Sequence, residues 1–181
     1  AAANVTYKLL LDPRLQVPPH DETCIEAVKI RAPRDTFIAT VIYRVPEERR
    51  NEHTKTIILS HGNATDNGAM FPIQVVLAHS LDCNVVSYDY SGYGESGGVP
   101  DERATYRDID IVFDYVVDQI SPAENIVLYG QSVGSGPCCY LASHESIGGM
   151  ILHSPFMSGM RVLTPSRYVF SLSLSCALFR G

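Results

Sequence analysis

One serine stands in a sequence pattern that can make its hydroxyl a nucleophile. Ser132 is the centre of residues 130–134, Gly-Gln-Ser-Val-Gly, and the apolar run 126–129 directly precedes this segment. In a nucleophile elbow, a strand enters a tight turn that opens a helix, and the positions two before and two after the serine must be very small. Gly130 and Gly134 meet this requirement. We therefore predict that the Ser132 hydroxyl stands clear at the end of a strand.

A second segment offers backbone N–H groups that could stabilise a negative charge developing on a reacting oxygen. Residues 60–63, Ser-His-Gly-Asn, end another apolar run, and the glycine lets the backbone turn sharply toward the same sheet edge. We predict that the N–H groups of Asn63 and Val133 are the two oxyanion-hole donors, each typically contributing about 10²–10³ in rate. His61 is expected to be a scaffold for this turn rather than a general base.

A glycine-rich loop resembles a dinucleotide-binding pattern. Residues 92–97 read Gly-Tyr-Gly-Glu-Ser-Gly, which matches G-x-G-x-x-G. The next helix, however, is expected only after Pro100, and no acidic residue ends a strand about 20 residues further on. We therefore expect no nucleotide here. The spacing of cysteines and histidines matches no zinc or haem site, so no metal and no other cofactor is expected either.

Composition limits the class of protein. The chain has 181 residues, of which 45% are hydrophobic and 19% charged, and a net charge of −6. These are values of one globular domain, and the acidic balance argues against a nucleic-acid partner. No apolar run reaches ~18 residues, the length that spans a bilayer. Five cysteines without regular spacing favour reduced thiols and a cytoplasmic location.

Strands alternate with helices along most of the chain. Alternating apolar residues predict a hairpin over 24–31 and 36–45, and continuous apolar runs predict buried strands over 56–60, 84–88, 126–129 and 148–152. Helices are predicted over 66–80, 101–119 and 133–144. The apolar face of the middle one comprises Ala104, Ile109, Val112, Phe113, Val116 and Val117. This order predicts a single α/β domain over 1–181 with a mostly parallel, doubly wound sheet.

Four segments together carry a family resemblance, namely residues 59–64, 87–94, 126–134 and 151–159. They resemble α/β-hydrolase-domain proteins of the family-17 branch, with the Bem46-like serine hydrolases as the wider group. The resemblance covers residues 24–162. It implies the α/β-hydrolase fold and a serine hydrolase that removes palmitoyl groups from cysteines of membrane-associated proteins. It also implies peripheral membrane association through an acylated, cysteine-rich N-terminal segment, which this sequence does not contain.

Three functions remain open on the sequence. The first is hydrolysis of S-acylated proteins through an acyl-enzyme at Ser132. The second is a Bem46-like carboxylester or lysolipid hydrolase, which would use the same residues on an acyl-ester substrate. The third is a catalytically incomplete fragment that only binds partners or acyl chains. Activity across thioester and ester substrates would distinguish them.

The acid and base that a serine nucleophile requires are hard to find. α/β-Hydrolases place them after the serine, but the only later acid is Glu145 and the only later histidines are His144 and His153. Glu145 lies ~15–20 Å along the helix that starts at the elbow, too far to orient a base. His153 ends a strand and is nearer, yet it belongs to an ordinary strand-end motif.

The sequence accordingly predicts an incomplete fold. We expect the last strands and helices of the family, with their Asp and His, to be missing, and residues 161–181 to be a tail unrelated to the family. Two consequences follow. Catalysis should be poor, since loss of a triad member leaves only ~10³–10⁴ over water. The strand over 148–152 should form an uncovered sheet edge, which favours aggregation.

Overall fold

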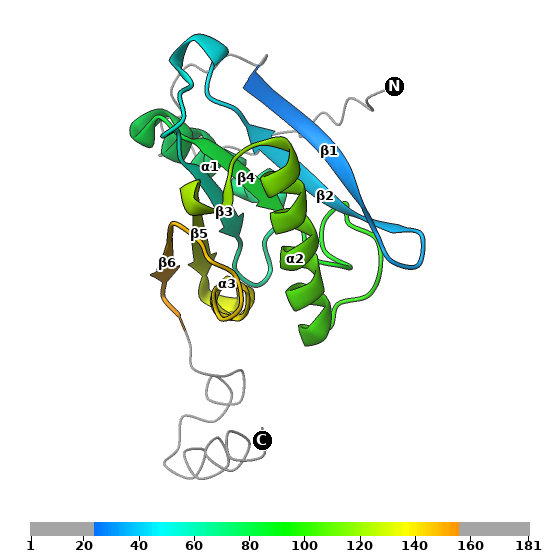
Figure 1. Cartoon of the computed structure of the whole chain (residues 1–181). Coiled ribbons are helices and arrows are strands. Elements are labelled where there is room, and N and C mark those ends of the chain that lie inside the picture. Colours follow the sequence, from blue (N-terminus) through cyan, green and yellow to red (C-terminus); the bar gives the residue numbers. More distant parts are fainter. Residues whose placement is uncertain (1–23, 156–181) are drawn as a thin grey trace.

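A computed structural model of the chain describes residues 24–155 (Figure 1). These residues form a six-stranded sheet in the order β1-β2-β4-β3-β5-β6. β3 to β6 are parallel, β1 and β2 form an antiparallel hairpin, and β2 runs antiparallel to β4. The strands are β1 (Ile25–Ala32), β2 (Thr36–Tyr43), β3 (Thr56–Ser60), β4 (Asn84–Tyr88), β5 (Ile126–Gln131) and β6 (Gly149–His153).

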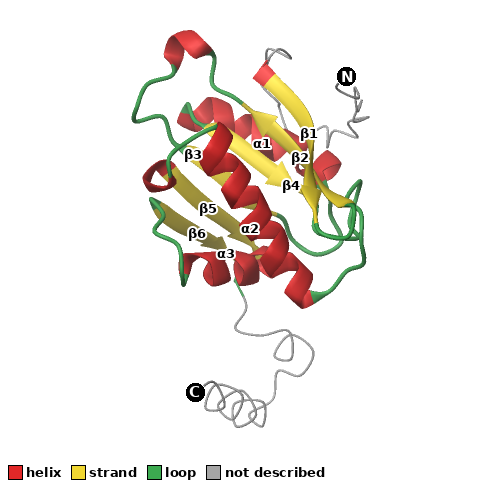
Figure 2. Cartoon of the chain, turned by 45° about the vertical axis from the view of Figure 1, so that its right-hand side comes forward, coloured by secondary structure: helices red, strands yellow, loops and turns green. Residues whose placement is uncertain are grey.

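Helices cover both faces of this sheet (Figure 2). α1 (Asn67–Leu81) packs on one face, and α2 (Glu102–Gln119) and α3 (Ser135–Ala142) pack on the other. Side chains of β3 alternate between the two layers, because Ile58 joins the core under α2 and α3 whereas Ile57 and Leu59 join the core under α1. The predicted doubly wound α/β fold is thereby confirmed.

Two details of the predicted helices are wrong. The helix expected over 133–144 is only α3, and a 3-10 turn over Ser132–Gly134 precedes it, because the chain turns too tightly there for α-helical bonding. On α2, Val117 was assigned to the buried face but is 38% exposed. Asp108 is buried instead, where it accepts hydrogen bonds from the N–H and the hydroxyl of Ser91 at 2.7 and 2.8 Å.

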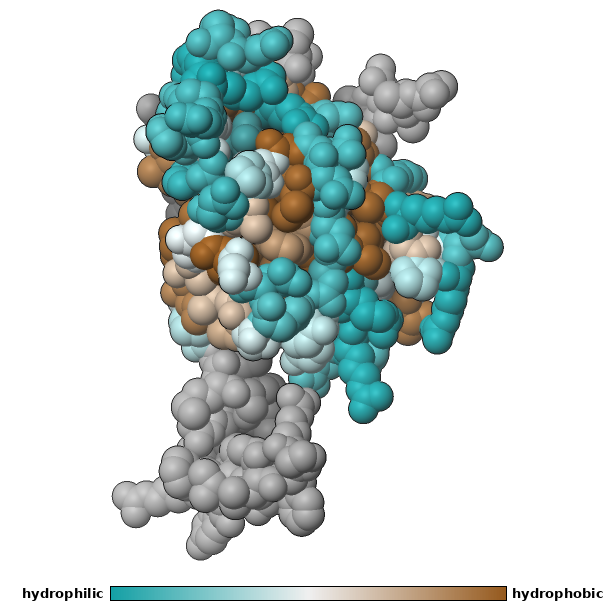
Figure 3. All heavy atoms as spheres, in the orientation of Figure 1, coloured by the Kyte–Doolittle hydropathy of each residue, from teal (hydrophilic) through white to brown (hydrophobic). Residues whose placement is uncertain are grey.

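β6 is an edge strand of the described sheet, as predicted. It pairs only with β5, and Met150 and Ile151 are 41% and 46% exposed. Apolar atoms reach the surface on the left of Figure 3, where β6 lies in Figure 1. The tail predicted over 161–181, and the missing strands and helices, lie outside the described residues. None of the helices between residues 24 and 155 is long and apolar enough to cross a membrane.

Candidate active site

Ser132 occupies the strand–turn–helix junction that its sequence pattern predicts. β5 ends at Gln131, Ser132 follows with φ of +51°, and α3 begins three residues later. A serine in this left-handed region of backbone space is strained and persists only where its surroundings hold it. The Ser135 hydroxyl is one such restraint, since it donates to the Ser132 carbonyl at 2.6 Å. The side chain of Ser132 is half-buried.

The two elbow glycines lie where the strand and the helix come closest. A Cβ on Gly134 would lie 2.1 Å from the Ser60 carbonyl oxygen at the end of β3. A Cβ on Gly130 would lie 2.7 Å from the Gly134 carbonyl oxygen and 2.9 Å from Ser135 Cα. Both neighbours are backbone, so neither can move aside cheaply. The absence of a side chain at these two positions therefore allows the elbow to pack directly against β3.

The segment after β3 runs beside the elbow. His61 is 1% exposed, and Gly62 packs against the side chain and carbonyl oxygen of Gln131, the residue before Ser132. Ala64 has φ of +54°, and Asp66 then accepts a hydrogen bond from the Ala69 N–H to cap α1. We refer to residues 61–66 as the oxyanion loop. It brings the backbone of Asn63 to the same sheet edge as Val133; their role as donors stays a prediction.

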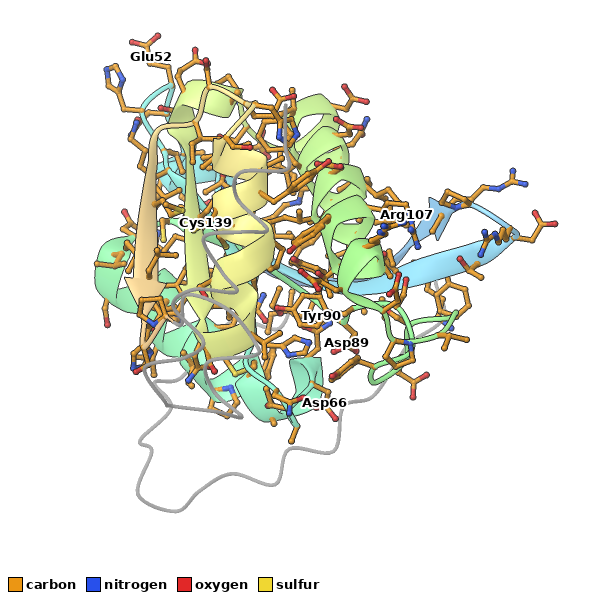
Figure 4. All side chains as sticks on the ribbon, turned by 90° about the horizontal axis from the view of Figure 1, so that it is seen from below. Glu52, Asp66, Asp89, Tyr90, Arg107 and Cys139 are labelled. Carbon is orange, nitrogen blue, oxygen red and sulfur yellow. The ribbon has the colours of Figure 1, made fainter. Side chains whose placement is uncertain are left out.

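A second loop, residues 89–98, supports the oxyanion loop. Asp89 Oδ1 accepts from the Asn67 N–H at 2.7 Å, and the Tyr90 hydroxyl donates to the His61 carbonyl at 2.7 Å. The Tyr93 hydroxyl donates to Asn63 Oδ1 at 3.1 Å. Figure 4 looks onto this edge, where Asp66, Asp89 and Tyr90 gather. The three supporting residues 89, 90 and 93 were missed by sequence reasoning.

The glycines of the loop over residues 89–98 allow that loop to fold tightly. Gly94 has φ of +47°, and a Cβ there would lie 2.2 Å from Asp89 Oδ2. Gly92 has φ of +79° and lies against Pro100. The G-x-G-x-x-G pattern thus lets a tight loop close over a buried carboxylate. That carboxylate, at the end of a strand and next to a glycine-rich turn, was the available sequence signal for the support.

Burial shifts the protonation of the two ionisable groups beneath the oxyanion loop. It raises the pKa of Asp89 to about 6, although the N–H bonds from Asn67 and Glu95 act in the opposite direction. It also lowers the pKa of His61, against the effects of the Gly62 carbonyl and Asp66. His61 is therefore neutral near pH 7, and its Nε2, 3.8 Å from Asp89 Oδ1, is not part of an ion pair there.

The described histidines after Ser132 are engaged elsewhere. His144 lies at the far end of α3, where its Nδ1 bonds the Tyr140 carbonyl at 2.9 Å. His153 lies opposite Gln131 in the β5–β6 register, and its Nδ1 bonds the Tyr129 hydroxyl at 2.9 Å. Within residues 24–155, no histidine is hydrogen-bonded to the Ser132 hydroxyl. The described part of the site therefore comprises the predicted nucleophile and the oxyanion loop.

This architecture defines a class, and comparison with known proteins gives the family. The chain belongs to the α/β-hydrolase fold family, whose model matches residues 55–170. It is 44% identical to the α/β-hydrolase domain-containing protein aho-3 of Caenorhabditis elegans over 153 residues, which are 81% of this chain and 45% of that protein. It is 42% identical to α/β-hydrolase domain-containing protein 17C of Homo sapiens over 146 residues, which are 78% and 43%.

These relatives confirm the resemblance to the family-17 branch, and the chain spans a little under half of their length. Solved structures agree on the fold. An α/β-hydrolase from Vibrio vulnificus has a TM-score of 0.65 at 18% identity, covering 84% of this chain and 55% of its own. A lidless α/β serine hydrolase from Xanthomonas campestris has a TM-score of 0.59 at 24% identity, covering 76% and 64%.

Proposed function

We propose that this chain carries the nucleophile and oxyanion hole of a serine hydrolase that releases fatty acids from S-acylated proteins. One observation supports it above all: Ser132 stands at φ of +51° between β5 and α3, with Gly134 pressed onto Ser60. Strained backbone of this kind clusters at functional sites, because it persists only where the surrounding structure holds it. The membership of this chain in the α/β-hydrolase fold family also supports a hydrolase function.

The chemistry is acyl transfer in two steps. The Ser132 Oγ attacks the thioester carbonyl, and the N–H groups of Asn63 and Val133 stabilise the resulting oxyanion. The intermediate collapses as the C–S bond breaks, the cysteine sulfur takes a proton, and an acyl ester remains on Ser132. Water then attacks this ester, which releases the fatty acid and restores the serine hydroxyl. The residue that moves these protons is not assigned among residues 24–155.

The thioester substrate rests on the family-17 resemblance. That branch is expected to act on palmitoylated cysteines at the cytoplasmic membrane surface, with attachment through an acylated segment preceding the domain. A Bem46-like hydrolase of carboxylesters or lysolipids would use the same serine and the same loop. A fragment that only binds acyl chains or partners is the third possibility, favoured by the absence of a base bonded to Ser132 in the described part.

Three matched substrates test this function. The chain and its Ser132→Ala variant are incubated with an S-palmitoyl peptide, the corresponding O-palmitoyl-serine peptide and a lysolipid, and released fatty acid and protein mass are measured. We expect a mass increase of one palmitoyl group on the wild type only, formed faster from the thioester. Faster reaction with the ester or lysolipid would favour the second function. Saturable acyl-chain binding without any transfer, equal in both proteins, would favour the third.

A further inference from the structure

We propose that His61 is the positioning residue of the oxyanion hole, because its ring locks the Gly62–Asn63 peptide with the Asn63 N–H facing away from the protein core. This inference rests on the proposed function, since it assigns a cause to the orientation of one of the two predicted donors. It gives a role to a buried histidine that the acyl-transfer steps do not use.

The geometry of one peptide bond turns the Asn63 N–H outward. His61 Nδ1 lies 2.8 Å from the Gly62 carbonyl oxygen. In a trans peptide the carbonyl oxygen and the following N–H point in opposite directions, and no described peptide is cis. Because the Gly62 carbonyl turns inward to a side chain that is 1% exposed, the Asn63 N–H must turn outward.

The hydrogen bond to the Gly62 carbonyl fixes which nitrogen of the His61 ring carries a proton. A carbonyl oxygen can only accept a hydrogen bond, so Nδ1 must carry the proton. Neutral His61 then has a bare Nε2, which has no hydrogen-bond partner among the described residues and lies 3.8 Å from Asp89 Oδ1. The same Nδ1–H persists when the ring is protonated. The lock therefore needs only the Nδ1–H and not a charge on the ring.

Tyr90 and Tyr93 hold the His61 ring and its backbone. The Tyr90 hydroxyl donates to the His61 carbonyl at 2.7 Å, so the peptide before the lock is held as well. The His61 ring packs against both Tyr90 and Tyr93, with ring centroids 4.3 and 5.8 Å away. A buried ring in contact with both tyrosines has little freedom to swing, and it can therefore hold the carbonyl in place.

The Gly62–Asn63 peptide needs such a restraint because glycine is conformationally free. Gly62 has no Cβ, and a glycine samples backbone conformations that other residues avoid. Without His61, the Gly62–Asn63 peptide could turn over and present its carbonyl oxygen to the site. An oxygen there would repel the oxyanion that the N–H should stabilise. Loss of one donor of this kind costs about 10²–10³ in rate.

Two substitutions of His61 distinguish the effect of its hydrogen bond to the Gly62 carbonyl from the effects of side-chain burial and polarity. The side-chain amide nitrogen of asparagine can take the place of Nδ1, whereas that of glutamine takes the place of Nε2. His61→Asn therefore retains the donor to Gly62, and His61→Gln removes it. We expect phosphonylation of Ser132 by a fluorophosphonate to slow by about 10²-fold in His61→Gln, in the maximal rate rather than in the half-saturating concentration. His61→Asn should recover at least about tenfold of that loss.

The test has a readout that does not depend on reactivity. NMR of the wild type should show the His61 proton on Nδ1 and a coupling across the hydrogen bond to the Gly62 carbonyl, and thermal unfolding shows whether each variant is folded. Equal rates for folded His61→Gln and His61→Asn, or a wild-type ring protonated on Nε2 only, would overturn the inference. A wild type that shows the NMR coupling but does not react would overturn the proposed function and leave the lock supported.

Discussion

The two sides of Ser132 are built very differently. Toward β3 and β4, hydrogen bonds connect the oxyanion loop to the loop over 89–98, and His61, Asp89 and Tyr90 are each 1% exposed. Toward β6, the strand pairs on one side only, Ile151 is 46% exposed, and the exposed ring of His153 bonds the Tyr129 hydroxyl. One side is held from several directions, and the other is an open edge.

The difference separates two requirements of acyl transfer. Stabilising an oxyanion needs backbone N–H groups held rigidly in place, and the β3–β4 side provides that rigidity. Moving protons needs a titratable group with an orienting partner, and the β6 side supplies none to Ser132 within residues 24–155. The segments proposed for the first requirement all lie within residues 24–155, whereas no residue of that range is assigned to the second.

The largest expected difference in stability is between substitutions of two glycines, one packed against β3 and one on β6. Gly134→Ala should lower the free energy of unfolding by about 4 kcal/mol, since the new Cβ would lie 2.1 Å from a backbone oxygen that cannot yield. Gly149→Ala on β6 should change it by less than about 0.5 kcal/mol, because nothing lies within 4 Å of its Cβ position. Urea unfolding measures both. Similar losses for the two variants would remove the contrast.

Two neighbouring side chains compare the packing of β5 and β6. Leu128 and Met150 are register partners, but Leu128 is fully buried whereas Met150 is 41% exposed. Leu128→Ala should cost about 3 kcal/mol through lost burial and the cavity left behind. Met150→Ala should cost less than about 1 kcal/mol. Equal shifts in the urea midpoint would mean that β6 is buried in solution.

On the β3–β4 side, Asp89 should also make the free energy of unfolding depend on pH. Its pKa is about 6 in the folded chain against an ordinary 3.8, so the folded state binds more protons between these values and stability falls as pH rises from about 4 to about 6. The expected loss is on the order of 2–3 kcal/mol. The free energy of unfolding of the wild type and of Asp89→Asn is measured at pH 4 and pH 7. His61, whose pKa is lowered, makes stability rise with pH, and it does so in both proteins.

The Asp89 signature is therefore a difference between the two proteins. The free energy of unfolding of Asp89→Asn relative to wild type should be lower at pH 4 than at pH 7, because only the wild-type carboxyl gains from protonation. A gap between the two proteins that is the same at both pH values would contradict the raised pKa.

The smallest effect on stability, but a visible one on association, is expected at the β6 edge. An exposed apolar edge strand favours pairing with another chain, and a lysine there opposes it. Ile151→Lys should lower self-association at high concentration with less than about 0.5 kcal/mol change in stability. Light scattering against concentration measures this. A wild-type chain that stays monomeric throughout would show that the edge does not promote pairing.

Much of this contrast could be anticipated from the sequence, and the reasons for the gaps are physical. Apolar runs and glycine spacing are local, so the strands, the elbow at Ser132 and the edge position of β6 were predictable. The support from Tyr90 and Tyr93 was not, because hydrogen bonds from a hydroxyl to a distant oxygen leave no periodic trace. Asp89, at a strand end beside a glycine-rich turn, was the one sequence signal of this support. Val117 was misplaced because each four-residue step along α2 rotates the side chain further from the buried face, so exposure rises from Ile109 through Phe113 to Val117.

We propose that Ser132 of this chain is a reactive nucleophile beside an oxyanion hole formed by Asn63 and Val133. Labelling with a fluorophosphonate, located by mass spectrometry, tests it most directly, with Ser132→Ala as the test variant and Ser143→Ala, an exposed serine directly after α3, as the matched control. We predict one label per chain on Ser132, lost in Ser132→Ala and retained in Ser143→Ala. A folded chain that takes no label, or takes it equally in all three proteins, would contradict the claim.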